Sequence, residues 1–302
     1  MKKSTRNIII TRDRKAFNII AYTVVILITV LCLLPFWLVV IGSFTDESEI
    51  FSRGYSFWPN TFSIEAYKLA FKYPNKIFRA YGITVSITVI GTFLSLLITT
   101  LCGYALQRYE FRSRGFFTMF IFFTVLFNGG LVPWYLLITN YLKLKDTYSI
   151  MILTQLVNVY HIILMKNFMR TVPNTLIEAA KIDGAGEFCI FFRVVLPLLK
   201  PALASIGMFT ALSYWNEWRT GMLFLQNSEL FPLQYYLYRL LNSVEFLKNA
   251  TSDMAASLTN ISFPSESLKL AMTVIATGPI ICLYPFLQKY FVKGITIGAI
   301  KG

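Results

Sequence analysis

Charged residues are scarce in this sequence: Asp, Glu, Lys and Arg make up 14% of its 302 residues, whereas hydrophobic residues make up 56%. Soluble globular domains contain about 25% charged residues, so this composition excludes that class and indicates the lipid bilayer as the solvent. The apolar residues form runs close to the ~20 residues that an α-helix needs to cross the hydrocarbon core, rather than short alternating segments. We therefore predict an all-α integral membrane protein and not a β-barrel.

The sequence is also poor in residues that build metal sites, disulfide frameworks and hydrolytic centres. It has four cysteines, without C-x-x-C spacing, and one histidine, which argues against a zinc site or a disulfide framework. It contains no Walker A pattern, no nucleophile elbow and no H-E-x-x-H helix. We therefore predict no catalytic residue, no metal and no cofactor bound by this chain, and ATP could drive it only through a separate ATPase.

The net charge of +13 comes from 28 basic and 15 acidic residues. The basic residues are spread over short loops between apolar runs and form no long basic face with interleaved aromatic residues, which argues against nucleic acid as a partner. Basic loop residues are retained on the cytoplasmic side of a membrane. The segments on the same side as the N-terminus hold 17 of them, against nine in the opposite loops. Both the N-terminal segment, residues 1–16, and the C-terminal tail, residues 289–302, are therefore predicted to be cytoplasmic.

Between these ends lies a predicted transmembrane domain, residues 17–288. We place six spans near residues 17–43, 81–106, 116–138, 148–165, 201–225 and 268–287. The third span contains Asn128, Gly129, Gly130 and Pro133, and such residues inside an apolar segment indicate a kink or a broken helix. The outer loop between the fifth and sixth spans is polar, and the spacing of its aromatic residues Phe231, Tyr235, Tyr236 and Tyr238 suits a short helix at the outer surface.

The inner loop between the fourth and fifth spans, residues 166–200, carries the most informative pattern. It contains Glu-Ala-Ala at 178–180, then Gly184 after three residues, and Val-Val-Leu-Pro at 194–197 after nine more. Residues 175–182 are predicted to form a short helix whose small alanines give a close-approach face. Gly184 can supply the φ > 0 that ends such a helix.

A second short helix is predicted after Gly184. It carries Phe188, Phe191 and Phe192 on one side and ends near Pro197. A helix-turn-helix at the membrane surface, with one small-residue face and one aromatic stripe, is suited to docking into a groove on a partner protein. The alternative is an amphipathic helix lying on the bilayer. Such a helix usually has a basic face, whereas acidic residues are mixed with the lysines of this loop.

The pattern resembles the EAA signature of the permease subunits of bacterial ABC importers, and every fixed position is matched. The resemblance implies that the loop is a coupling helix that docks on a separate ABC ATPase dimer, whose subunits hold ATP and Mg. It also implies that Glu178 pairs with a basic residue of the ATPase groove, while the small residues permit a close fit. The residues that it assigns to ATPase coupling are Glu178, Ala179, Ala180, Asp183, Gly184, Leu196 and Pro197.

Further strings resemble the maltose-type carbohydrate permeases, which are binding-protein-dependent transport system inner membrane components. They lie at residues 103–106, at Pro133 with 135–137, at 214–218, and in the ending 286–294 with Gly298, Lys301 and Gly302. The resemblance implies a second homologous permease subunit in a heterodimer, and an extracellular sugar-binding protein. This chain would then form half of the translocation path for a carbohydrate, an oligosaccharide, in the bacterial cytoplasmic membrane.

Sugars are bound by aromatic faces and a few placed polar groups, so residues of these kinds at membrane depth are candidates for the substrate path. An ionisable residue inside a span is costly unless it faces a cavity or a partner, which singles out Glu217. The alternative is that its tryptophan neighbours belong to an interfacial belt and that Glu217 pairs with Arg219. The candidates are Asn128, Tyr214, Trp215, Asn216, Glu217 and Trp218.

Two other functional classes stay open as alternatives. A secondary transporter not driven by ATP would gather ionisable residues at mid-membrane and show an inverted internal repeat, which six spans with one such acidic residue match poorly. A membrane enzyme or an assembly factor would need a catalytic constellation or a binding motif of its own, and the sequence offers no catalytic constellation.

Overall fold

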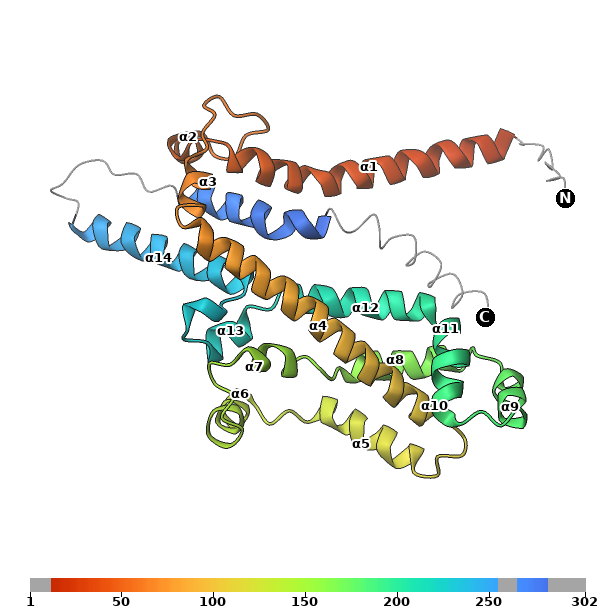
Figure 1. Ribbon diagram of the computed structural model, residues 1–302. Coiled ribbons are helices and arrows are strands. Elements are labelled where there is room, and N and C mark those ends of the chain that lie inside the picture. The colour runs from red at the N-terminus through yellow and green to blue at the C-terminus, as the bar shows by residue number, and fades with distance from the viewer. Residues whose placement is uncertain (1–11, 255–264, 282–302) are drawn as a thin grey trace. The chain divides into compact units, whose positions relative to one another are not determined.

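The computed structural model describes residues 12–254 and 265–281 of the chain (Figure 1). Within these residues the chain is helical and has no β-strand, apart from an isolated bridge between Thr45 and Phe62. The predicted all-α fold is thus confirmed. The predicted C-terminal tail, residues 289–302, and the end of the sixth predicted span lie outside the described residues.

The chain divides into two compact units. The small unit comprises residues 1–72 and 244–275, and the large unit comprises residues 73–243 and 276–302. The small unit contains α1 (Arg12–Ser43), α2 (Glu47–Arg53) and α3 (Glu65–Ala70). Helix α1 contains the first predicted span and exposes its apolar side chains along most of its length, as a helix that faces lipid does.

Within the small unit, Glu47 caps a helix that is far away in the sequence. Its Oε1 accepts hydrogen bonds from the backbone N–H groups of Ser265 at 2.9 Å and Glu266 at 2.8 Å, and its Oε2 accepts from that of Ser267 at 2.8 Å. Both serine hydroxyls also donate to this carboxylate. The helix that begins here covers residues 266–281, so Glu47 satisfies its unpaired N-terminal donors. Burial by itself would raise the pKa of Glu47, but these hydrogen bonds outweigh it and hold the pKa below its ordinary value.

The large unit is organised around α4 (Pro74–Gln107), which packs against α8 (Val159–Met169) and α12 (Lys200–Trp215) (Figure 1). Small residues line the buried face of α4 at four-residue steps, and they are Gly91, Ser95, Thr99 and Gly103. A Cβ atom on Gly91 would lie 2.5 Å from Cζ of the Tyr214 ring, and one on Gly103 would lie 3.2 Å from the backbone nitrogen of Lys166. Helices with such faces approach each other closely in membranes.

The third predicted span is broken, as its sequence indicated. Helix α5 (Arg114–Leu126) is followed by α6 (Leu131–Leu136), which continues as the π-helical η1 (Leu137–Tyr141), and the two halves meet at 111°. At the break, Gly130 has a φ of 87° and its N–H donates to Oδ1 of Asn128 at 2.9 Å. The glycine conformation and the side-chain turn together end α5 and start α6.

The fourth predicted span, residues 148–165, is not one helix. Helix α7 (Tyr148–Leu153) and α8 are separated by the irregular segment 154–158. Asn158 starts α8 by accepting a hydrogen bond from the backbone of His161, which is how an N-cap asparagine competes with helix continuation.

The fifth predicted span, residues 201–225, is also interrupted. Helix α12 ends at Trp215, and α13 (Arg219–Phe224) begins after a break. Oε1 of Glu217 accepts from the backbone N–H of Thr220 at 2.8 Å and so caps the new helix.

The loop after the fifth predicted span differs from its prediction. It contains η3 (Ser228–Leu230) and then α14 (Leu233–Met254), a helix of 22 residues rather than a short one. The polar composition of this segment concealed a helical pattern, because three of its buried residues, Leu233, Leu237 and Val244, recur on one face.

Two helices of the described residues, α1 and α4, are long and apolar enough to cross a membrane. Two bent pairs pass as spans only when their halves are joined, namely residues 114–126 with 131–141 and residues 187–198 with 200–215. The described residues thus contain up to four spans by length and composition, and six spans stay a prediction.

The contact between α4 and the Tyr214 ring predicts that Gly91→Ala is destabilising. The ring is fully buried and its hydroxyl donates to the backbone of Ile152, so it cannot move aside. Overpacking of this kind costs about 1–3 kcal/mol, and we expect a lower unfolding temperature of the purified protein. Gly82→Ala is the matched control on the same helix, because nothing lies within 4 Å of its added methyl group. Equal stability of the two variants would contradict the close approach.

The Glu47 cap predicts a pH-dependent loss of stability. A carboxylate whose pKa is lowered by folding stabilises the protein above its unfolded pKa, near 4.5, and this contribution is lost as the pH falls through the lower folded value. At neutral pH, Glu47→Gln should have a lower unfolding temperature than the wild type. Below about pH 4.5 the unfolding temperature of the wild type should therefore fall more steeply with pH than that of the variant. Thermal unfolding in detergent checks this, with Glu65→Gln at an exposed position as control. Parallel pH profiles for wild type and Glu47→Gln would refute the cap's contribution.

Candidate functional site

The EAA loop, residues 166–200, folds as two short helical segments joined by a glycine turn. The first is α9 (Asn174–Ile182), and the second runs through α10 (Glu187–Cys189), the π-helical η2 (Ile190–Val195) and α11 (Leu196–Leu198). The loop therefore has the helix-turn-helix form that its sequence predicts.

The turn between the two segments is a Schellman motif. Gly184 has a φ of 77°, as expected for the residue that ends α9. The N–H of Ala185 donates to the carbonyl of Ala180 at 2.9 Å, and the N–H of Gly184 donates to that of Lys181 at 3.0 Å. Because both bonds need the left-handed conformation, this position favours glycine over a side chain with a Cβ atom.

The inner face of the loop packs on the large unit. Ile177, Ile190, Phe191 and Val195 are buried in one apolar cluster with residues of α4, α8 and α12. Phe191 was expected on the partner-facing aromatic stripe, but it is only 1% exposed and its ring packs 5.3 Å from that of Tyr104. The sequence pattern missed this because an aromatic stripe alone does not show which face is covered by the same chain.

The outer face of the loop is open within the described chain. Ile182 and Phe188 are 87% and 76% exposed, and the acidic Glu178 and Asp183 of the same loop are exposed as well. The seven residues assigned to coupling divide between the faces: Glu178, Ala179, Asp183, Gly184 and Pro197 are exposed, while Ala180 and Leu196 are partly covered by the apolar cluster. Their role in coupling stays a prediction.

A network of charged residues anchors the loop to the end of α4. Tyr104 donates its hydroxyl to Oε2 of Glu187 at 2.6 Å, and Oε1 of the same carboxylate lies 3.2 Å from Nη2 of Arg108 and 3.4 Å from Nζ of Lys181. Glu110 joins the network through Lys181 at 2.8 Å and Arg108 at 3.3 Å. The Tyr104 hydrogen bond is the main cause that holds the pKa of Glu187 below its ordinary value. The network thus ties both helical segments of the loop to α4.

A polar cavity of about 240 Å³ lies where the fourth and fifth predicted spans are both interrupted. Non-helical backbone at membrane depth is tolerated where it is buried in protein or lines a water-filled space. The cavity is lined by Thr154, Gln155, Val157, Asn158, His161, Thr210, Ser213, Glu217 and Arg219.

Glu217 is held by neutral groups in this cavity, and not by the ion pair with Arg219 that the alternative interpretation gave it. Its Oε2 accepts from Nε2 of Gln155 and its Oε1 from the backbone of Thr220. Ser213 donates to the amide oxygen of Gln155. In the part of the chain that the structure describes, Arg219 takes part in no ion pair, and it is exposed at the rim of the cavity. Sequence reasoning missed Gln155, because a single polar residue in an apolar run gives no sign of its partner.

The other substrate-path candidates lie elsewhere. Tyr214 is 1% exposed, and Trp215 is buried with its Nε1 donating to the carbonyl of Ala276 at 3.1 Å, so both pack inside the chain. Asn216 is exposed and bonds to the backbone of Leu212, while the ring of Trp218 lies 4.9 Å from that of Tyr238. Asn128 lines a separate cavity of about 570 Å³ at the break in the third predicted span. Of the six candidates, Glu217 alone lines the polar cavity.

Known proteins resemble this chain along nearly its whole length. Residues 100–297 match the family described as "Binding-protein-dependent transport system inner membrane component". The polygalacturonan/rhamnogalacturonan transport system permease protein YtcP of Bacillus subtilis is 35% identical over 288 residues, which cover 95% of this chain and 99% of YtcP. Protein LplC of Bacillus subtilis is 38% identical over 270 residues, which cover 89% of this chain and 90% of LplC.

A solved structure agrees with these relatives. A chain in the crystal structure of a bacterial ABC transporter involved in the import of the acidic polysaccharide alginate superposes with a TM-score of 0.76 at 29% identity, covering 93% of this chain and 98% of that chain. The likeness therefore extends over the fold as well as the signature loop. This chain belongs to the family of binding-protein-dependent transport system inner membrane components and is a permease of the sugar ABC transporter type.

Proposed function

We propose that this chain is one of two permease subunits of an ATP-driven importer and forms half of the translocation path for an oligosaccharide. The second subunit is a homologous permease, an extracellular binding protein delivers the substrate, and a separate ATPase dimer binds ATP and Mg and docks on the EAA loop. The observation that carries the proposal is the form of this loop: its inner face is fixed to the large unit, and its outer face presents Glu178, Ile182 and Phe188.

The geometry suits a docking element that must transmit force. The exposed Ile182 and Phe188 offer apolar area for an ATPase groove, and Glu178 offers a charge for a basic residue there. The glycine turn lets the partner approach the backbone closely. Because the loop is rooted by its apolar cluster and by Glu187, movement of a docked ATPase would displace α4 and α12 with it.

The lining of the polar cavity is suited to binding the substrate. Gln155, Ser213 and Glu217 supply donors and acceptors of the kind that bind sugar hydroxyls, and Arg219 supplies a cation without a partner carboxylate among the described residues. YtcP is named for polygalacturonan, and the solved transporter imports alginate, which is acidic. We therefore propose an acidic oligosaccharide as substrate, with Arg219 as a ligand of its carboxylate groups.

The docking proposal predicts that Glu178→Lys and Gly184→Val uncouple the importer. The first reverses the charge offered to the ATPase, and the second places a β-branched residue at a φ of 77°. Both proteins should insert in the membrane, yet ATP-driven uptake by vesicles and recovery of the ATPase with the purified chain should fall about tenfold or more, as expected for loss of a buried charged contact.

Gly186→Ala provides the control for the glycine variant. Gly186 lies two residues away in the same loop, but its φ is −72°, which alanine adopts without strain. Uptake should stay near the wild-type level. Unchanged uptake by both Glu178→Lys and Gly184→Val would contradict the proposal that the ATPase docks on this loop.

The substrate proposal predicts that Arg219→Gln impairs import of acidic oligosaccharides. A charge-assisted hydrogen bond contributes about 1.5–3 kcal/mol, so uptake of labelled oligogalacturonide at low concentration should fall about tenfold or more. Arg219→Lys should retain part of the activity, and Lys143→Gln, which removes a charge outside the cavity, should retain all of it. Wild-type uptake of neutral oligosaccharides alone would reject the acidic substrate but leave the importer assignment intact.

A further inference from the structure

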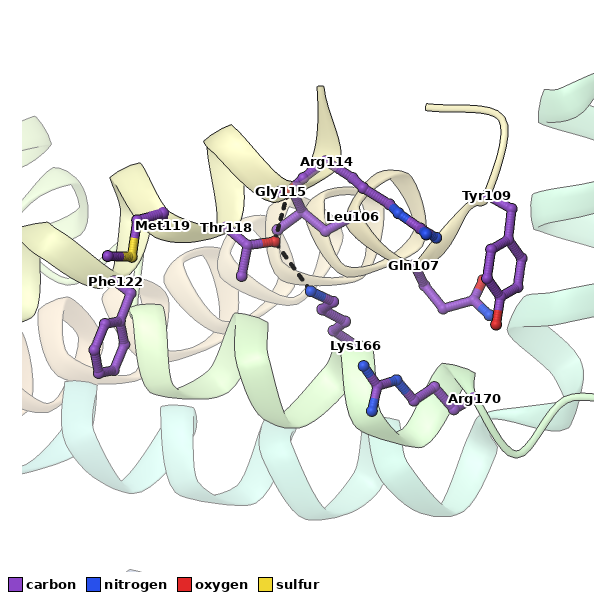
Figure 2. A pocket seen from close by; sticks show the side chains of 10 residues that line it. All are labelled: Leu106, Gln107, Tyr109, Arg114, Gly115, Thr118, Met119, Phe122, Lys166 and Arg170. Carbon is purple, nitrogen blue, oxygen red and sulfur yellow. Dashed lines mark hydrogen bonds between the residues drawn. The ribbon is translucent and has the colours of Figure 1, made fainter. Parts of the chain in front are cut away.

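A third cavity, of about 600 Å³, lies at the end of the large unit that carries the EAA loop. It is formed between the end of α4, the start of α5 and the last turns of α8 (Figure 2). None of the coupling or substrate-path residues discussed above lines it. Its walls are Leu106, Gln107, Tyr109, Arg114, Gly115, Thr118, Met119, Phe122, Lys166 and Arg170.

Three cations face this cavity, and it contains no acidic side chain. Lys166 and Arg170 come from one end of α8, and Arg114 comes from the first turn of α5. Lys166 is half-buried and donates to Oγ1 of Thr118 at 3.0 Å, as Figure 2 shows. Within the described residues none of the three forms an ion pair, and Glu110 and Glu187 are paired with Arg108 and Lys181 instead. Like charges that lie together without a counter-charge repel one another. A bound anion would relieve this repulsion.

The rest of the lining shows what kind of anion fits. Arg114 lies over the ring of Tyr109 at 4.6 Å, and beyond Thr118 the wall becomes apolar at Met119 and Phe122. Helix α5 buries none of its residues, and its neighbouring Phe116 and Phe120 are 69% and 57% exposed. A free phosphate would use the cations and leave the apolar wall empty. A molecule with an anionic head and an acyl chain would use both.

We propose that this cavity binds the headgroup of an anionic phospholipid, with an acyl chain along Met119 and Phe122. Basic pockets between membrane helices on the cytoplasmic side bind such headgroups. The proposal rests on the proposed function only for its orientation, since the EAA loop faces the cytoplasm when an ATPase docks on it. The bound phosphate would neutralise the basic residues at the end of α8, where the EAA loop begins, and so hold the start of the loop at the membrane surface.

The test measures lipid retention by the purified full-length chain. The protein is equilibrated in detergent with phosphatidylglycerol or with phosphatidylcholine, and bound lipid is counted by native mass spectrometry. We expect at least about tenfold preference for phosphatidylglycerol, and its loss in Lys166→Gln/Arg170→Gln. The charge-conserving Lys166→Arg/Arg170→Lys should keep the preference, as should the control Lys143→Gln/Lys145→Gln, which removes two charges elsewhere.

Three outcomes would overturn the proposal. Equal retention of the two lipids by wild type would show that the cations serve another partner, such as an acidic segment of a protein subunit. Displacement of phosphatidylglycerol by excess inorganic phosphate would show a site for free anions. Full preference in Lys166→Gln/Arg170→Gln would place the lipid elsewhere. The wild-type comparison decides even where a variant fails to fold, and retention is measured without ATPase, so failure here leaves the importer assignment untouched.

Discussion

The close approach of α4 to α8 and α12 is the constraint on which the large unit depends. A Cβ atom at Gly91 would clash with the Tyr214 ring, and one at Gly103 would lie in tight contact with the backbone of α8. In lipid there is no water to exclude, so the hydrophobic effect contributes little to helix association. Close van der Waals packing between the helices drives the association instead. Both helices that flank the EAA loop, α8 before it and α12 after it, are therefore fixed to one common support.

The parts of the structure that were predictable from the sequence are those whose cause is local. Gly184 ends α9 because of its own backbone freedom, and Gly130 breaks the third span for the same reason. The breaks near Gln155 and Glu217 combine local caps with a tertiary contact, because Gln155 at the first break donates a hydrogen bond to Glu217 at the second. In the sequence each of these positions is only a polar residue in an apolar run, and two continuous spans were therefore predicted.

The acidic residues of the EAA loop show the same limit at the candidate site. Glu178 and Glu187 belong to one loop and look alike in the sequence, yet Glu178 is exposed whereas Glu187 is held by Tyr104, Arg108 and Lys181. The family signature includes Glu178 but not Glu187. Glu187 therefore anchors the loop to the end of α4, whereas Glu178 has no such contact among the described residues and is free for the partner contact proposed above.

The length of α4 gives the anchoring network a mechanical meaning. At one end, Tyr104 and Arg108 hold Glu187 of the loop, and nearer the other end the hydroxyl of Thr84 accepts the backbone N–H of Leu233 at 2.7 Å, at the start of α14. A straight helix of 34 residues is about 50 Å long. Thr84 lies 24 residues from Arg108, about 36 Å along the helix, so a tilt of about 5° about the loop end displaces Thr84 by about 3 Å. A small tilt imposed at the loop would thus reach α14 as a shift about as long as a hydrogen bond, with no relay of side chains between them.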